Sequence, residues 1–210
     1  MSLTSSTHLT FLTPNKLIIM QQIGIFGGTF NPIHNGHIEL ARRLLSLAGL
    51  DEVWFVVSPQ NPFKRNDVLL DDALRLEMVR LALEGEPRLV PCDYEFRLPR
   101  PSYMWHTLQA MAADYPDREF VLLIGADNWA RFDEWYASRE ILAHHRIVVY
   151  PREGSLLAAS SLPPGVTLAD TGLVPGSSTE VRRRIAAGQP IDGLVPQVVA
   201  EFIRSKNLYV

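Results

Sequence analysis

Apolar residues recur along this chain in two alternating patterns: short continuous runs, and longer runs in which they are spaced three or four positions apart. The continuous runs are typical of buried strands, and they fall at Ile23–Phe26, Asp51–Val57, Leu89–Cys92, Glu119–Ile124, Arg146–Tyr150 and Val166–Asp170. The spaced runs predict amphipathic helices at Gly36–Leu47, Asp71–Leu83, Ser102–Asp114, Ser138–Ala143, Ser178–Ala187 and Pro196–Lys206. We expect a serine cap at Ser102 to open the third helix.

Strands that alternate with helices predict a parallel sheet covered by helices on both faces. We therefore expect an α/β fold, a Rossmann-like doubly wound sheet followed by a C-terminal helical segment. Residues 20–210 are expected to form a single domain. Residues 1–19 are rich in Ser and Thr, and we interpret them as an extension that is either disordered or left over from cloning.

Ligands of open α/β sheets bind beyond the carboxyl ends of the strands. Four segments follow a predicted strand or open a predicted helix, and these are where we look for chemistry. They span residues 27–37, 58–65, 125–136 and 176–182.

Composition and charge limit the kind of ligand. The chain has 210 residues, 47% apolar and 20% charged, with a formal net charge of −3. This balance argues against a general nucleic-acid binder but allows small anionic substrates. Cys92 is the single cysteine, which excludes an internal disulfide and favours a cytoplasmic protein. No apolar run is long enough to predict a membrane span.

The stretch GIFGGTFNPIHNGH places two glycines after a strand and two histidines at a helix start. Gly27 and Gly28 would let backbone N–H groups approach a phosphate, although a plain tight turn explains them equally. His34 and His37 would lie at the positive end of the helix dipole, which suits a polyphosphate. A metal site would need a third ligand that no nearby pattern supplies, so no protein metal site is expected.

A second stretch, GSSTEVR, opens a later helix. Ser177 and Glu180 have the spacing of a capping box, which explains both residues without any ligand. Arg182 has no such explanation, because a cation in the first helical turn opposes the dipole unless an anion is bound there. Arg183 and Arg184 are interpreted as a solvated face.

These two stretches, in this order, resemble the signatures of the nucleotidylyltransferase superfamily, H-x-G-H and I-S-S-T-x-[IV]-R. The resemblance implies that His34, His37, Arg182 and Lys64 are catalytic. It also implies that the following residues bind ATP: Gly27, Gly28, Thr29, Phe30, Gly36, Gly125, Asp127, Ser177, Ser178 and Thr179. Asp127 has an alternative explanation as the cap of a short helix.

Three further segments resemble bacterial nicotinate-nucleotide adenylyltransferases: PSYMWHT, IGADNWARFDEWY and LVPQVVAEFIRSKNLY. The implied reaction is ATP-dependent adenylylation of nicotinate mononucleotide to deamido-NAD, with release of pyrophosphate and with Mg²⁺ accompanying ATP. The implied mononucleotide-binding residues are Tyr103, Thr107, Trp135 and Asn31. Core packing is the alternative explanation for Trp135.

Departures from that family concern the choice of acceptor. Asn31 and His106 each replace an Asp, Met104 replaces a Thr, and NPFK stands in place of P-P-H-K. Arg152 is shifted by one position from an expected R-P-G. The alternatives left open are nicotinamide mononucleotide or pantetheine-phosphate adenylyltransferase, a cytidylyltransferase, and a non-catalytic nucleotide sensor. The oligomeric state is also open, and a homo-oligomer is compatible with the sequence.

Overall fold

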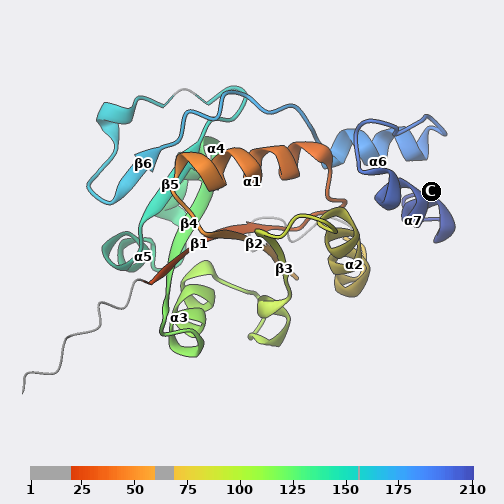
Figure 1. The fold of residues 1–210 in the computed structure, drawn as a ribbon. Coiled ribbons are helices and arrows are strands. Elements are labelled where there is room, and N and C mark those ends of the chain that lie inside the picture. The colour runs from red at the N-terminus through yellow and green to blue at the C-terminus, as the bar shows by residue number, and fades with distance from the viewer. Residues whose placement is uncertain (1–19, 60–68, 156) are drawn as a thin grey trace, which may run out of the picture.

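A six-stranded, wholly parallel sheet forms the centre of the computed structural model, which describes residues 20–59, 69–155 and 157–210. Its strand order, β3-β2-β1-β4-β5-β6, reverses direction between β1 and β4 and confirms the expected Rossmann-like fold (Figure 1). The strands are β1 (Gln21–Gly28), β2 (Glu52–Val57), β3 (Leu89–Cys92), β4 (Arg118–Gly125), β5 (Ile147–Tyr150) and β6 (Val166–Leu168). The 1–19 extension and Lys64 lie outside the described residues.

The helices follow the predicted order, with one short addition after β4. They are α1 (Asn35–Leu47), α2 (Asp72–Ala82), α3 (Met104–Asp114), α4 (Ala126–Trp129), α5 (Ser138–His144), α6 (Ser178–Ala186) and α7 (Gln197–Ser205). Short 3₁₀ turns lie at η2 (Tyr94–Arg97), η3 (Phe132–Glu134) and η4 (Ala159–Ser161). Within the described part of the chain, no helix is long and apolar enough to cross a membrane.

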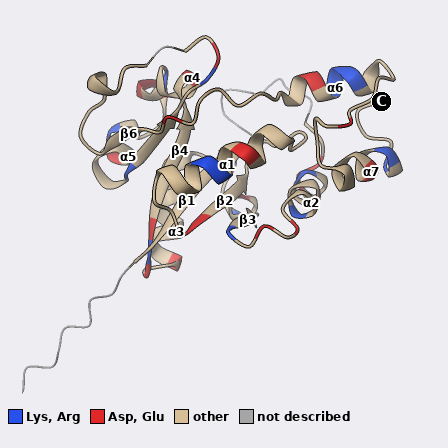
Figure 2. Ribbon diagram, turned by 45° about the horizontal axis from the view of Figure 1, so that its top comes forward, with Lys and Arg blue, Asp and Glu red and all other residues tan. Residues whose placement is uncertain are grey.

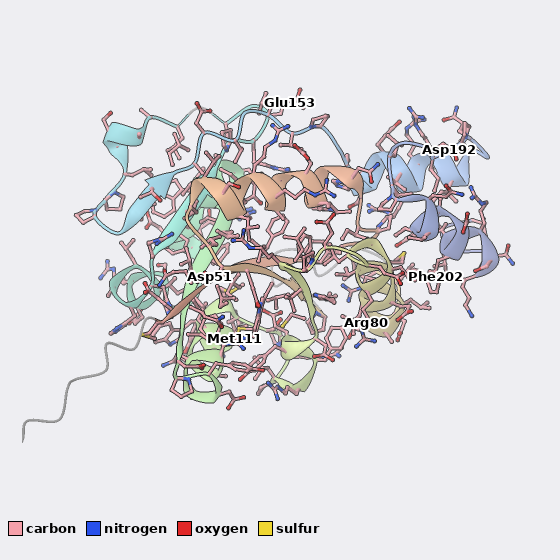
Figure 3. The ribbon with its side chains drawn as sticks, viewed as in Figure 1. Asp51, Arg80, Met111, Glu153, Asp192 and Phe202 are labelled. Atoms are coloured by element: carbon pink, nitrogen blue, oxygen red, sulfur yellow. The ribbon has the colours of Figure 1, made fainter. Side chains whose placement is uncertain are left out.

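Two apolar cores lie on opposite faces of the sheet, because successive strand side chains point to opposite sides. Val53, Phe55 and Val57 of β2 join the core with α1, α2 and α7, whereas Trp54 and Val56 join the core with α3 and α5. Figure 1 shows α1 and α3 on opposite sides of the sheet. In Figure 3, Met111 of α3 lies on the side away from α1, and its side chain is fully buried.

Two local predictions were wrong. Gly27 and Gly28 are not a turn but the last two residues of β1, paired with Val56 and Val57 of β2. Ser102 does not cap α3, which begins two residues later with Tyr103 as its N-cap residue. The hydroxyl of Ser102 instead donates a hydrogen bond to a buried carboxylate, a partner that local sequence does not reveal.

The long connection from β6 to α6 positions the second signature segment. It passes over α1 and brings the start of α6 beside the start of α1, while α6 and α7 lie at the far side of the molecule from β6 (Figure 1). α7 packs against α2. Segments from the two ends of the chain therefore meet near the carboxyl ends of the strands.

Candidate active site

His34 and His37 cap the start of α1 reciprocally. The Nδ1 atom of His34 accepts a hydrogen bond from the backbone N–H of His37 at 3.3 Å, and the Nδ1 atom of His37 accepts one from the N–H of His34 at 3.2 Å. The two rings stack with their centroids 3.6 Å apart. Because each Nδ1 is an acceptor, a neutral ring must carry its proton on Nε2. The backbone thus fixes both tautomers as Nε2–H donors.

The burial of His34 keeps it neutral. Its side chain is only 5% exposed, and loss of solvation, reinforced by the nearby positive charge of Arg152, lowers its pKa from 6.5 to about 4. At neutral pH the ring is therefore an uncharged hydrogen-bond donor.

The two signature segments meet, although they lie far apart in the sequence. Ser178 Oγ donates to the carbonyl oxygen of Pro32 at 2.8 Å, across 146 positions. Arg182 donates to the carbonyl oxygen of Asn31 at 2.8 Å, across 151 positions, and to Thr179 Oγ1 at 3.3 Å. A Cβ atom on Gly36 would collide with the carbonyl oxygen of Pro175, so this close approach requires glycine.

The predicted capping box of α6 forms only in part. Ser177 Oγ accepts from the N–H of Glu180 at 3.4 Å, but the Glu180 carboxylate does not reach back to the cap. It binds Arg183 and Arg184 at 2.8 Å instead, and these hydrogen bonds lower the pKa of Glu180 to about 2. Figure 2 shows that acidic and basic residues follow one another along the ribbon of α6. Arg182 is the one of the three arginines that turns toward α1.

A cavity of about 450 Å³ opens between the carboxyl ends of β1 and β4, where the strand order reverses. Tyr103 and Trp135 line it as expected, and Trp135 also packs against Phe132 at 5.4 Å between ring centroids. The full set of lining residues comes from five strand ends and the segments after them: Gly27, Gly28, Ser58, Glu95, Ser102, Tyr103, Met104, Leu122, Leu123, Ile124, Gly125, Asn128, Glu134, Trp135, Tyr136 and Tyr150.

Several expected ligand contacts do not line this cavity. Thr107 is fully buried and its hydroxyl donates to Glu95 at 2.9 Å. Asn31 is 2% exposed, and its side-chain oxygen accepts from the Tyr209 hydroxyl at 2.7 Å. Phe30 is buried edge-on against His37, with 5.1 Å between ring centroids. These three buried side chains therefore stabilise the structure around the site and do not line the cavity.

Asp127 lies beside the cavity in an ion pair. Its carboxylate is 3.7 Å from Arg152 Nε, and both side chains are about half exposed. It does not cap α4, whose N-cap residue is Gly125. A Cβ atom on Gly125 would collide with the Asp127 carboxylate and with the Arg152 side chain, so glycine is needed to bring this pair over the end of β4.

Arg75 supports the site but was not among the residues predicted from the sequence. Its guanidinium is fully buried in α2 and uses all five N–H donors, on the carbonyl oxygens of Leu70, Thr29, Ser58 and Pro59 and on the carboxylate of Asp72. It thereby fixes the backbone that follows β1 and β2. An arginine in an amphipathic helix looks like part of a polar face, so no sequence signal marks this role.

Hydrogen-bond donors gathered at the reversal of a doubly wound sheet define the class of nucleotide-binding α/β proteins. The cytidylyltransferase-like family model matches residues 25–184. A protein of Bacteroides fragilis is 52% identical over 80% of this chain and 84% of its own length, and one of Bacteroides thetaiotaomicron is 47% identical over 90% and 92%. Both are named probable nicotinate-nucleotide adenylyltransferase.

The fold is also that of a solved relative. The nicotinic acid mononucleotide adenylyltransferase of Plasmodium falciparum, complexed with NaAD, superposes with a TM-score of 0.76 at 18% identity, over 90% of this chain and 97% of that one. The chain therefore belongs to the cytidylyltransferase-like family and, within it, to the nicotinate-nucleotide adenylyltransferases.

Proposed function

We infer that the protein transfers the adenylyl group of ATP to nicotinate mononucleotide, which gives deamido-NAD and pyrophosphate in NAD biosynthesis. The observation that carries this inference is the meeting of the two signature segments at the starts of α1 and α6, next to a cavity large enough for a nucleotide. The shared name of the relatives specifies the acceptor.

The chemistry requires positioning more than activation. An oxygen of the mononucleotide phosphate attacks the α-phosphorus of ATP, and the bond to the oxygen that bridges the α- and β-phosphorus atoms breaks. This phosphate is already an anion at neutral pH, so no general base is needed. The protein must instead hold two anions in line and stabilise the charge of the transition state.

The starts of α1 and α6 form the proposed phosphate site. The Nε2–H groups of His34 and His37 donate to the triphosphate, and the Arg182 guanidinium, held by Asn31 and Thr179, supplies a positive charge. The backbone of Ser178 and Thr179 lies in the first turn of α6, where free N–H groups favour an anion. Ser177, Gly27, Gly28 and Thr29 complete this site, and Lys64 would add a second cation.

The cavity is the proposed mononucleotide site. Tyr103 and Trp135 line the cavity and are proposed to stack on or enclose the pyridine ring. The start of α3 also faces the cavity through Tyr103 and Met104, and among the described residues no side chain caps this helix. Its first amides can therefore receive the nicotinate carboxylate. Asp127 is proposed to accept a hydrogen bond from a ribose hydroxyl of ATP.

Mg²⁺ is proposed to arrive with ATP. The residues that the structure describes contain no group of three or more His, Cys, Asp or Glu side chains that is able to hold a metal. The oxygen ligands of Mg²⁺ would come from phosphates and water, as is common for this ion. In this proposal the protein side chains bind mainly the nucleotide, which in turn holds the cation.

A pyrophosphate-release assay with ATP and a panel of phosphorylated acceptors tests this function. We expect kcat/KM for nicotinate mononucleotide to exceed that for nicotinamide mononucleotide by about 100-fold or more, because two hydrogen bonds to a carboxylate contribute ~1.5–3 kcal/mol each. Equal values for the two, or a preference for the amide, would contradict the acceptor. A nucleotide sensor would bind ATP and release no pyrophosphate.

A further inference from the structure

Glu95 is a buried carboxylate in the wall of the cavity. It lies in η2, directly after β3, with 2% of its side chain exposed. Its Oε2 atom accepts a hydrogen bond from Ser102 Oγ at 2.7 Å, and its Oε1 atom accepts one from Thr107 Oγ1 at 2.9 Å. The carboxylate therefore binds Ser102, which precedes the first turn of α3, and Thr107, which ends that turn.

Burial of this group is costly, and no cation among the described residues offsets it. In the described part of the chain, no ion pair involves Glu95, and no Lys, Arg or His lines the cavity. Loss of solvation raises its pKa, and the hydroxyl donors oppose this shift. An apolar residue would fill the same space at lower cost, so the carboxylate calls for an explanation beyond packing.

The position of the Ser102 hydroxyl supplies that explanation. A serine just before a helix ordinarily turns its oxygen toward the first N–H groups of the helix. Here the Ser102 hydroxyl donates its proton to Glu95 instead. Ser58 Oγ lies 3.4 Å from Ser102 Oγ. The N-cap residue is Tyr103, which makes no side-chain cap. The helix itself supplies no acceptor for the N–H groups of its first turn, which begins at Met104.

We propose that Glu95 is a positioning residue for recognition of the pyridine base, because it draws the Ser102 hydroxyl away from the first amides of α3 and so keeps them available to the carboxylate of the mononucleotide. This inference rests on the proposed function. Glu95 does not touch the reacting phosphates, so its effect falls on the choice of acceptor and not on ATP.

Glu95→Gln tests the proposal. Glutamine keeps the size of the side chain, but it is uncharged and has one acceptor oxygen for the two hydroxyl donors, so its hold on Ser102 is weaker and the Ser102 hydroxyl can cap the helix. We expect kcat/KM for nicotinate mononucleotide to fall about tenfold, as loss of one charge-assisted hydrogen bond predicts. The value for nicotinamide mononucleotide and the KM for ATP should stay near those of the wild type.

A second change in the same chain isolates the mechanism. Adding Ser102→Ala to Glu95→Gln removes the hydroxyl that would otherwise cap the first amides of α3. Most of the preference for nicotinate mononucleotide should therefore return. Glu52→Gln is the matched control. Glu52 is also a hydrogen-bonded, partly buried carboxylate, but it lies at the amino end of β2, whereas the cavity lies at the carboxyl ends of the strands. It should leave the preference unchanged.

Three results would overturn the proposal. One is an equal loss for both mononucleotides, another is a rise in the KM for ATP, and the third is a double variant that recovers nothing. If Glu95→Gln does not fold, Ser102→Asn asks the same question with Glu95 intact, because its NH₂ still donates to Glu95 while its oxygen caps the helix. A wild-type protein that makes no product from nicotinate mononucleotide would refute the proposed function itself.

Discussion

The histidine pair shows how single residues acquire their chemistry from the backbone that they cap. Each ring uses Nδ1 on an N–H group of α1, which leaves Nε2 to carry the proton. A cap normally comes from a short polar side chain, so histidines in both positions agree with the ligand-binding role that we propose for them in addition to capping. Their two roles can be separated by substitution.

His37→Ala is expected to lower kcat about 100-fold, because loss of one donor to a charge that develops in the transition state costs about 3 kcal/mol. Binding of the mononucleotide should change little. Steady-state kinetics and a binding titration on the same preparation measure both effects.

The control for this change is His37→Gln. Glutamine at the third helical position can restore the reciprocal cap but lacks the imidazole donor. We expect its thermal stability to match that of the wild type while its turnover stays low. Full turnover in His37→Gln would assign the ring to capping alone.

The lowered pKa of His34 predicts a pH dependence of stability. The folded-state pKa of about 4 lies below the unfolded value of 6.5, so the unfolded chain takes up the proton first as the pH falls. The contribution of this residue is complete above pH 6.5 and is lost as the pH falls toward 4. Between pH 7 and pH 5 the loss should be about 2 kcal/mol.

Urea unfolding of the wild type and of His34→Asn at both pH values measures this loss. Asparagine is a good N-cap residue and does not titrate in this range, so it isolates the histidine from the carboxylates. The wild type should lose more stability than the variant by the amount given above. Equal losses would show that His34 titrates normally in the folded protein.

At the scale of elements, α6 sorts three consecutive arginines into two roles. The helix turns Arg183 toward Glu180 and Arg182 toward the carbonyl oxygen of Asn31, because neighbours in sequence are about 100° apart around a helix. Arg182→Ala should therefore raise the KM for ATP and lower kcat together, since a phosphate contact acts in both ground and transition states.

Arg183→Ala is the matched control, as it removes the same charge from the same helix. Its ion pair with Glu180 is exposed and contributes little to stability. We expect near wild-type kinetics for this variant. If both variants had the same kinetics, or if Arg182→Ala changed only the melting temperature, Arg182 would not be a phosphate ligand.

At the scale of the whole molecule, the last residues of the chain contact the loop that carries the proposed phosphate site. Tyr209 OH donates a hydrogen bond to Asn31 Oδ1 at 2.7 Å, and the backbone carbonyl oxygen of Asn31 accepts a hydrogen bond from Arg182. Tyr209 is partly buried beside α2 and α7, and burial raises the pKa of its hydroxyl. The C-terminal segment and the loop after β1 are therefore coupled through one side chain.

Tyr209→Phe should destabilise the protein by about 1 kcal/mol through the lost hydrogen bond and should also raise the KM for ATP, because Asn31 loses a fixed partner. Tyr94→Phe removes a comparable hydrogen bond, to Asp114 at 2.8 Å, on the opposite face of the sheet. It should lower stability alone. Unchanged ATP kinetics in Tyr209→Phe would show that the C-terminal segment only stabilises the fold.

The sequence by itself determined the order of strands and helices, and it located the two signature segments that we propose bind phosphate. Apolar periodicity reports which local structure can bury a face, and the order of strands and helices restricts the topology. The two signature segments also carry a strong local pattern, so His34, His37 and Arg182 could be found without a structure. Their assignment to ligand chemistry was strengthened by the resemblance to a family.

Only the tertiary structure decided which polar groups line the cavity and which are buried in the protein around it. Thr107 and Asn31 look like ligand contacts in sequence but are buried, whereas Glu95 and Arg75 look like surface charges but are buried hubs of hydrogen bonds. The physical reason is that a buried polar group must find its partners among neighbours in space. Ser102 shows the consequence: sequence predicts a helix cap, and a carboxylate seven residues earlier takes its hydroxyl instead.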